Sequence, residues 1–203
     1  MKEIGAHLQQ ALALQPDLVL ALTARADWLL YEAEYLAAAD AAPLKAEALA
    51  LARRAVALAS DDSGAWTIYG SALEASRDMG PALQALDRAL QLDTVNANAL
   101  LYKGRLLLLL GRFDEALGPV REAVALAPQV QDVAGSAALI ECQAQYFLRA
   151  YAQAMAACER ATGLGVDGHA TAMLLAVLYA RDRQLEKAQA AKARVLQEFP
   201  DLR

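Results

Sequence analysis

The chain has 203 residues, of which 57% are hydrophobic but only 6% aromatic, so its apolar content is mostly the strong helix formers alanine and leucine. A net charge of −5 and an isoelectric point near 5.1 argue against nucleic acid as a partner, because phosphate binding needs a basic field. No segment alternates apolar and polar residues with a period of two, so we expect no β-strands.

Residues 2–14 are predicted to form an amphipathic helix with Ile4, Leu8, Ala11 and Leu12 on one face. No partner helix precedes it. Residues 1–16 are therefore expected to be either an amino-terminal cap or a partial repeat of a longer protein, and we favour the partial repeat, because the ends of helical arrays need polar caps. This segment lacks the sustained apolar core of a secretory signal.

From residue 17 onward, large and small residues recur with a fixed period. The repeated pairs, each displaced by 34 residues, are Trp66 and Leu100, Gly70 and Gly104, Ala82 and Ala116, and Ala89 and Ala123. A 34-residue period indicates a helical hairpin repeat. Small residues are expected at fixed positions of such a hairpin, because two antiparallel helices approach closely only where neither presents a bulky side chain.

The repeat divides the rest of the chain into units 17–62, 63–96, 97–130, 131–168 and 169–203. The small residue that opens the second helix of each unit is, in order, Ala48, Ala82, Ala116, Ala154 and Ala188. The step of 38 from Ala116 to Ala154 marks a four-residue insertion, which we place at Gln131–Ala134, between two hairpins. Unit 17–62 has about ten extra residues around Tyr35–Pro43, where the run Ala37–Ala39 favours longer helices over a loop.

The stretch Leu100–Pro128 meets almost throughout the pattern Trp/Leu, Gly, Tyr/Leu, Ala, Phe, Ala and Pro, and it resembles the tetratricopeptide repeat (TPR) family. The resemblance implies an all-α fold, a right-handed α-solenoid of stacked antiparallel helix hairpins. Residues 1–203 would then form a single array. It also implies a non-enzymatic scaffold that binds a protein or peptide partner.

In that family, the residues two, five, nine and twelve places into each repeat face a concave groove. The candidate peptide-binding residues at these positions are Asn98, Leu101, Arg105, Leu108, Leu139, Gln143, Tyr146, Met173 and Val177, and the same positions in unit 63–96 are Gly64, Thr67, Ser71 and Glu74. This groove is mostly apolar, so we expect an apolar or amphipathic peptide rather than a charged C-terminal tail. In the alternative interpretation, Leu101, Leu108 and Met173 pack against neighbouring helices.

Cys142 takes the place of the glycine in unit 131–168, and Cys158 lies on the second helix of the same hairpin. Their spacing fits no metal site, and we expect two free, buried thiols. A disulfide would require the two Cα atoms to lie within about 7 Å and would imply an oxidising compartment.

We expect no catalytic residues, no metal and no cofactor. Gly163, Gly165 and Gly168 formally match a dinucleotide-binding fingerprint but follow a helix instead of a strand, and His7 and His169 are interpreted as surface residues. The run Leu106–Leu110 is too short to span a membrane, so direct membrane insertion is not expected. The expected location is cytoplasmic, or periplasmic if the chain is a fragment.

A second hypothesis belongs to a different functional class. Residues 185–202 look like the tails of multidomain proteins, which favours a C-terminal regulatory or oligomerisation module of a larger bacterial signalling enzyme or transcription regulator. A homo-oligomer would then be an expected state of the chain.

Overall fold

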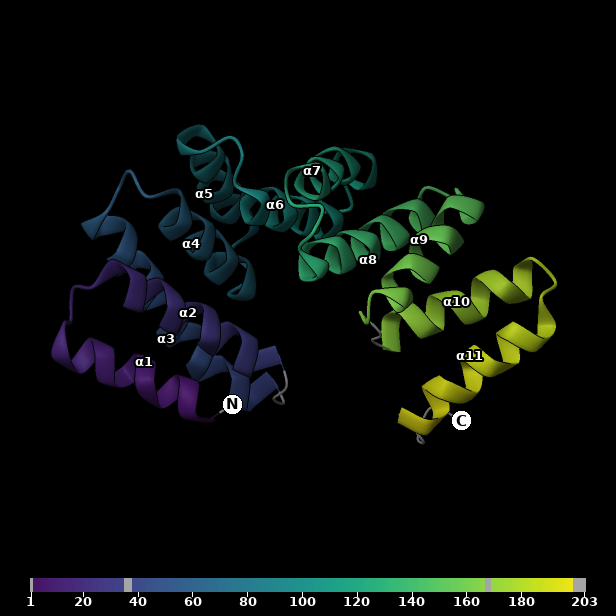
Figure 1. Ribbon diagram of the computed structural model, residues 1–203, viewed down its shortest axis with the longest axis horizontal. Coiled ribbons are helices and arrows are strands. Elements are labelled where there is room, and N and C mark those ends of the chain that lie inside the picture. The colour runs from purple at the N-terminus through teal and green to yellow at the C-terminus, as the bar shows by residue number, and fades with distance from the viewer. Residues whose placement is uncertain (1, 35–37, 167–168, 199–203) are drawn as a thin grey trace. The chain divides into compact units, whose positions relative to one another are not determined.

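The computed structural model describes residues 2–34, 38–166 and 169–198, and within these ranges it contains helices and no strands (Figure 1). The prediction of an all-α fold is confirmed. The helices are α1 (Lys2–Leu14), α2 (Val19–Glu34), α3 (Ala38–Leu58), α4 (Ser63–Ala75), α5 (Met79–Leu92), α6 (Ala97–Leu109), α7 (Phe113–Leu126), α8 (Gln131–Phe147), α9 (Tyr151–Gly163), α10 (His169–Arg181) and α11 (Leu185–Glu198).

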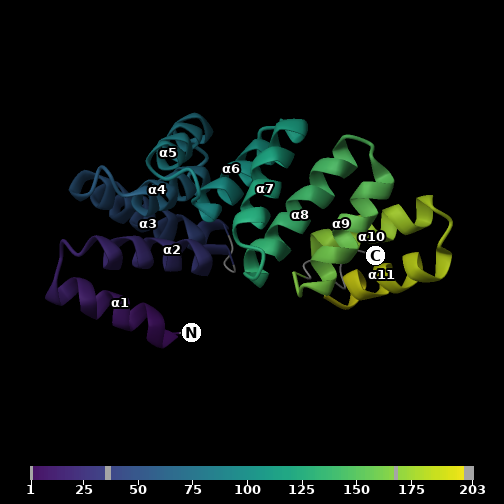
Figure 2. The same cartoon turned by 45° about the horizontal axis from the view of Figure 1, so that its top comes forward.

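The chain forms two compact units, residues 1–102 and 103–203, with the boundary inside α6. In the N-terminal unit, α1 packs on α2, the pairs α2–α3 and α4–α5 form hairpins, and α3 packs against α4. In the C-terminal unit, α8–α9 and α10–α11 form hairpins, with α7 against α8 and α9 against α10 (Figure 2). Neighbouring hairpins within a unit therefore bury apolar faces against each other.

The helices of a hairpin cross where a small residue on the first meets a large residue on the second. A Cβ added to Gly70 on α4 would lie 2.7 Å from Leu86 Cγ on α5, and a Cβ added to Gly104 on α6 would overlap Val120 Cγ2 on α7. Ala82, which opens the second helix α5, is fully buried. The predicted positions of closest approach are confirmed in these two hairpins.

The extra residues of the first hairpin lie largely in its helices. α2 has 16 residues and α3 has 21, whereas α4 has 13 and α5 has 14. This agrees with the expected lengthening of helices, although Tyr35–Ala37 lie outside the described residues.

The prediction that Gln131–Ala134 link two hairpins is wrong. These four residues form the first turn of α8, which is 17 residues long. They carry no helix breaker, and Asp132 in this turn interacts favourably with the positive end of the helix dipole. The insertion therefore extends a helix instead of a loop.

Four hairpin turns use the same backbone conformation. Arg77, Gly111, Arg149 and Arg183 have φ values between 60° and 75° and follow one another at steps of 34, 38 and 34 residues. In each turn, the N–H of the next residue donates to the carbonyl of the residue five positions before it, as from Asp78 to Leu73 and from Ala150 to Gln145. This is the Schellman ending of a helix, in which glycine is usually preferred.

Each unit has its own buried core. In the N-terminal unit, Leu22, Ala55 and Ala65 pack together with Leu12 of α1 against them. In the C-terminal unit, Leu175 and Leu178 of α10 pack on α8 and α9. None of the helices in the described part of the chain has the length and apolar content needed to cross a bilayer.

Candidate interaction surface

The residues predicted to line the groove lie on α6, α8 and α10, and their exposure differs from helix to helix. On α6, Leu101 and Leu108 are only 7% and 8% exposed. Asn98 is exposed and Arg105 is half-buried. Leu139, Gln143 and Tyr146 on α8 are all half-buried, whereas Met173 and Val177 on α10 are 47% and 51% exposed.

Only part of the predicted set is brought together within one unit. α8 and α10 are in contact in the C-terminal unit, and these two helices carry Leu139, Gln143, Tyr146, Met173 and Val177. Arg105 and Leu108 lie in the part of α6 that belongs to the same unit, whereas Asn98 and Leu101 belong to the N-terminal unit. The burial of Leu101 and Leu108 leaves little of either side chain accessible to a partner.

Two of the four matching positions in the N-terminal unit are occupied by buried polar side chains, whereas Gly64 is exposed and Glu74 is half-buried. Thr67 and Ser71 on α4 are 3% and 6% exposed. Asn96 Nδ2 donates to Ser63 Oγ at 2.7 Å and to Thr67 Oγ1 at 3.2 Å, while Asn96 Oδ1 accepts from the Ala99 N–H at the start of α6. Thr67 therefore joins helices and is not presented to solvent, which the sequence pattern alone did not reveal.

Aromatic side chains fix the carboxyl end of α8. Phe147 stacks on Phe113 of α7 with ring centroids 4.6 Å apart, and Tyr146 makes edge contacts with Phe147 and with Tyr151 of α9. The Arg181 guanidinium lies 3.9 Å above the centre of the Tyr151 ring. Tyr146 is therefore held in place by its aromatic neighbours.

Val177, one of the two most exposed apolar positions of the predicted groove, borders a hollow in the surface. A cavity of about 300 Å³ between α10 and α11 is lined by Ala176, Val177, Ala180, Leu185, Ala188, Gln189 and Lys192. Five of these seven side chains are alanine, valine or leucine. A shallow, mainly apolar depression can receive aliphatic side chains of a peptide or helix.

Charged side chains beside α8 and α10 are paired with one another. Glu141 on α8 accepts hydrogen bonds from Arg121 at 3.3 Å and from Arg160 at 2.5 Å. Tyr179 on α10 donates to Glu159 at 2.8 Å, and burial, followed by this hydrogen bond to a carboxylate, raises the pKa of Tyr179 to about 12. These pairs join neighbouring helices and hold the hairpins in register.

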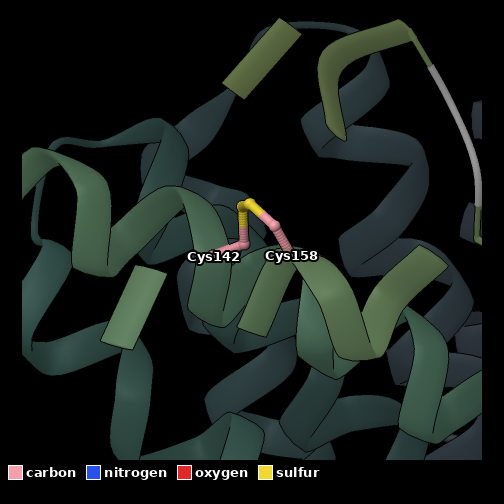
Figure 3. The surroundings of a disulfide bond; sticks show 2 residues. All are labelled: Cys142 and Cys158. Atoms are coloured by element: carbon pink, nitrogen blue, oxygen red, sulfur yellow. A yellow bond between two sulfur atoms is a disulfide. The ribbon is translucent and has the colours of Figure 1, made fainter. Parts of the chain in front are cut away.

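The prediction of free thiols is wrong, because Cys142 and Cys158 form a disulfide between α8 and α9 (Figure 3). Their Cα atoms are 5.0 Å apart, which is within the usual range for a disulfide. The sequence contained a signal for this pairing. The separation from 142 to 158 equals that from Gly70 to Leu86 and from Gly104 to Val120, which are contacts at helix crossings.

Within the described residues, no group of three or more histidine, cysteine, aspartate or glutamate side chains is arranged to hold a metal ion. The glycine-rich segment that begins at Gly163 ends α9 and is preceded by a helix, while Gly168 lies outside the described residues.

Known structures with the same arrangement of helices show the fold. PilW, a widely conserved type IV pilus biogenesis factor, is 18% identical over 97% of this chain and 84% of its own, with a TM-score of 0.73. The chain has the TPR fold. YrrB, a TPR protein with an unusual peptide-binding site, is 17% identical over 96% of this chain and 93% of its own, with a TM-score of 0.58.

A third structure with this fold binds a different kind of ligand. Human IFIT1, solved as a dimer with PPP-AAAA, is 18% identical over 95% of this TPR chain but only 45% of its own, with a TM-score of 0.76. No family model and no curated protein matches the sequence.

Proposed function

We propose that the chain is a non-enzymatic scaffold that binds an apolar or amphipathic peptide segment along the first helices of its hairpins. The observation that carries the proposal is the exposure of Met173 and Val177 on α10, of which Val177 also lines the apolar hollow between α10 and α11. Side chains of this size are usually buried, and a cluster of exposed ones favours an interaction surface.

The C-terminal unit is the better candidate for the binding region. Five of the predicted groove residues lie there on two helices in contact, and all five are at least partly exposed. They are Leu139, Gln143 and Tyr146 on α8 and Met173 and Val177 on α10. Leu101 and Leu108 stay in the proposed set, but their low exposure leaves little of either side chain for a partner to contact. Asn98, Arg105 and Gln143 are the polar residues of the set that carry an amide or a guanidinium group.

A protein or peptide partner is favoured over nucleic acid by charge. The net charge of −5 leaves the chain without the overall basic field that phosphate binding needs. YrrB, a protein of this fold, has a peptide-binding site, which supports the same choice of partner for this chain.

The proposal is tested with a displayed library of random peptides selected on the full chain. We expect the recovered peptides to carry aliphatic residues at the spacing of one helix face. Met173→Glu/Val177→Glu should weaken their binding at least tenfold, because two carboxylates would lie against the apolar peptide. Ala156→Glu, at an exposed position of α9, is the matched control.

Equal binding by both variants, with their helical circular dichroism intact, would rule out α10 as part of the site. Light scattering on the purified chain tests the second hypothesis. The scaffold proposal predicts a monomer that takes up one peptide, whereas a stable dimer without peptide would favour an oligomerisation module.

A further inference from the structure

The disulfide occupies the place of closest approach between the two helices of its hairpin. Gly70 meets Leu86 and Gly104 meets Val120 at the corresponding places of α4–α5 and α6–α7. In α8–α9 the same two positions are Cys142 and Cys158. A contact between glycine and a large aliphatic side chain is thus replaced by a covalent bond.

The bond lies inside the core of the C-terminal unit. Both cysteines are fully buried. They pack with Ala154 and Ala157 of α9 and with Leu175 and Leu178 of α10. The bond is therefore shielded from solvent by residues of α9 and α10.

We propose that the Cys142–Cys158 bond is a structural cross-link that stabilises the folded C-terminal unit, and that the chain therefore matures in an oxidising compartment. This inference is independent of the proposed peptide binding. It replaces the expectation of a cytoplasmic location, since disulfides persist outside the reducing cytoplasm.

The bond should stabilise the unit because there is little space where α8 and α9 cross. Two unbonded sulfur atoms need a wider separation than two bonded ones, so reduction would push α8 and α9 apart beneath α10. The oxidation itself is ordinary thiol–disulfide exchange. The two thiols lose two protons and two electrons to a low-molecular-weight disulfide such as oxidised glutathione, which leaves as two thiols.

The first measurement is thermal unfolding of the full chain after refolding with oxidised glutathione. One sample is measured directly, and a second is reduced before it is heated. A cross-link across 16 residues should raise the unfolding midpoint by about 10 °C relative to the reduced chain. In addition, dithiothreitol should reduce the disulfide of the native chain about tenfold more slowly than that of the chain in denaturant, because the bond is buried. Mass spectrometry after alkylation counts the thiols.

Cys142→Gly/Cys158→Val is the matched control, because it recreates the Gly104–Val120 contact of the preceding hairpin. We expect this variant to fold, and we expect reductant to leave its unfolding midpoint unchanged. It remains a usable control even if Cys142→Ser/Cys158→Ser fails to fold. The proposal is overturned if both thiols of the refolded chain alkylate in denaturant without reductant. It is equally overturned if reduction leaves the wild-type midpoint unchanged or shifts that of the control by the same amount.

Discussion

The backbone of Gly104 on α6 lies directly against the side chain of Val120 on α7, so that a Cβ on residue 104 would overlap Val120 Cγ2. This contact sets the distance between the two helices. Any side chain at position 104 must displace a β-branched residue that has few rotamers available.

Gly104→Ala should therefore destabilise the chain by about 1–3 kcal/mol through overpacking. Gly118→Ala is its control, since a Cβ there meets nothing within 4 Å and alanine is the better helix former by about 1 kcal/mol. Urea denaturation should show opposite signs for the two variants. If both stabilise the chain, the α6–α7 crossing is not at Gly104.

A second prediction concerns Asn96, which joins α4 to the start of α6. Asn96→Ala removes two hydrogen bonds to Ser63 and Thr67 and the cap on the Ala99 N–H, and should cost about 2–3 kcal/mol. Asn98→Ala, two residues away and exposed, should change the free energy of unfolding by less than about 0.5 kcal/mol. Equal costs would show that the buried cluster contributes little.

The left-handed hairpin turns give a third prediction. Arg149 has φ 61°, a conformation that costs a side-chain-bearing residue about 1 kcal/mol relative to glycine, so Arg149→Gly should stabilise the chain by about that amount. Gly111→Ala at φ 75° should destabilise it by a similar amount, since a Cβ there contacts nothing and conformation alone matters. Thermal unfolding of both variants checks the signs.

Tyr179 gives a prediction for alkaline pH. Its pKa is about 12 in the folded chain and 10 in the unfolded chain, so between these values the folded state binds more protons and stability falls as pH rises. The loss from this group should reach about 2–3 kcal/mol by pH 12 and be absent below pH 10. Tyr179→Phe, which removes the titrating group, should lose less stability over this range in urea denaturation. The same loss in both proteins would contradict a raised pKa.

The 34-residue spacing was enough to predict the hairpins and their crossings, because small residues such as Gly70 and Ala82 are required wherever two helices touch. The spacing did not predict the conformation of Gln131–Ala134, because these residues fit a helix or a loop equally well. In the structure they form the first turn of α8. The disulfide was the less favoured alternative for Cys142 and Cys158, because burial on a helix is equally typical of free thiols, although their spacing matches that of Gly104 and Val120 at a helix crossing.

The groove was harder to predict than the fold, because the exposure of equivalent positions depends on what covers each helix. Leu101 and Met173 occupy the same place in their repeats, yet Leu101 is 7% exposed and Met173 is 47% exposed. A position in the repeat identifies the face of a helix. The accessibility of that face depends on tertiary packing, which no local pattern encodes.

The most direct test of the scaffold proposal is to locate the bound peptide on the chain. A photoreactive amino acid is placed at Val177 on α10 or, as a control, at the exposed Ala156 on α9, and each protein is irradiated with a peptide selected on the wild-type chain. The proposal predicts a cross-linked peptide at position 177 and none at 156. Cross-linking at 156 alone would contradict it and place the partner on the second helices.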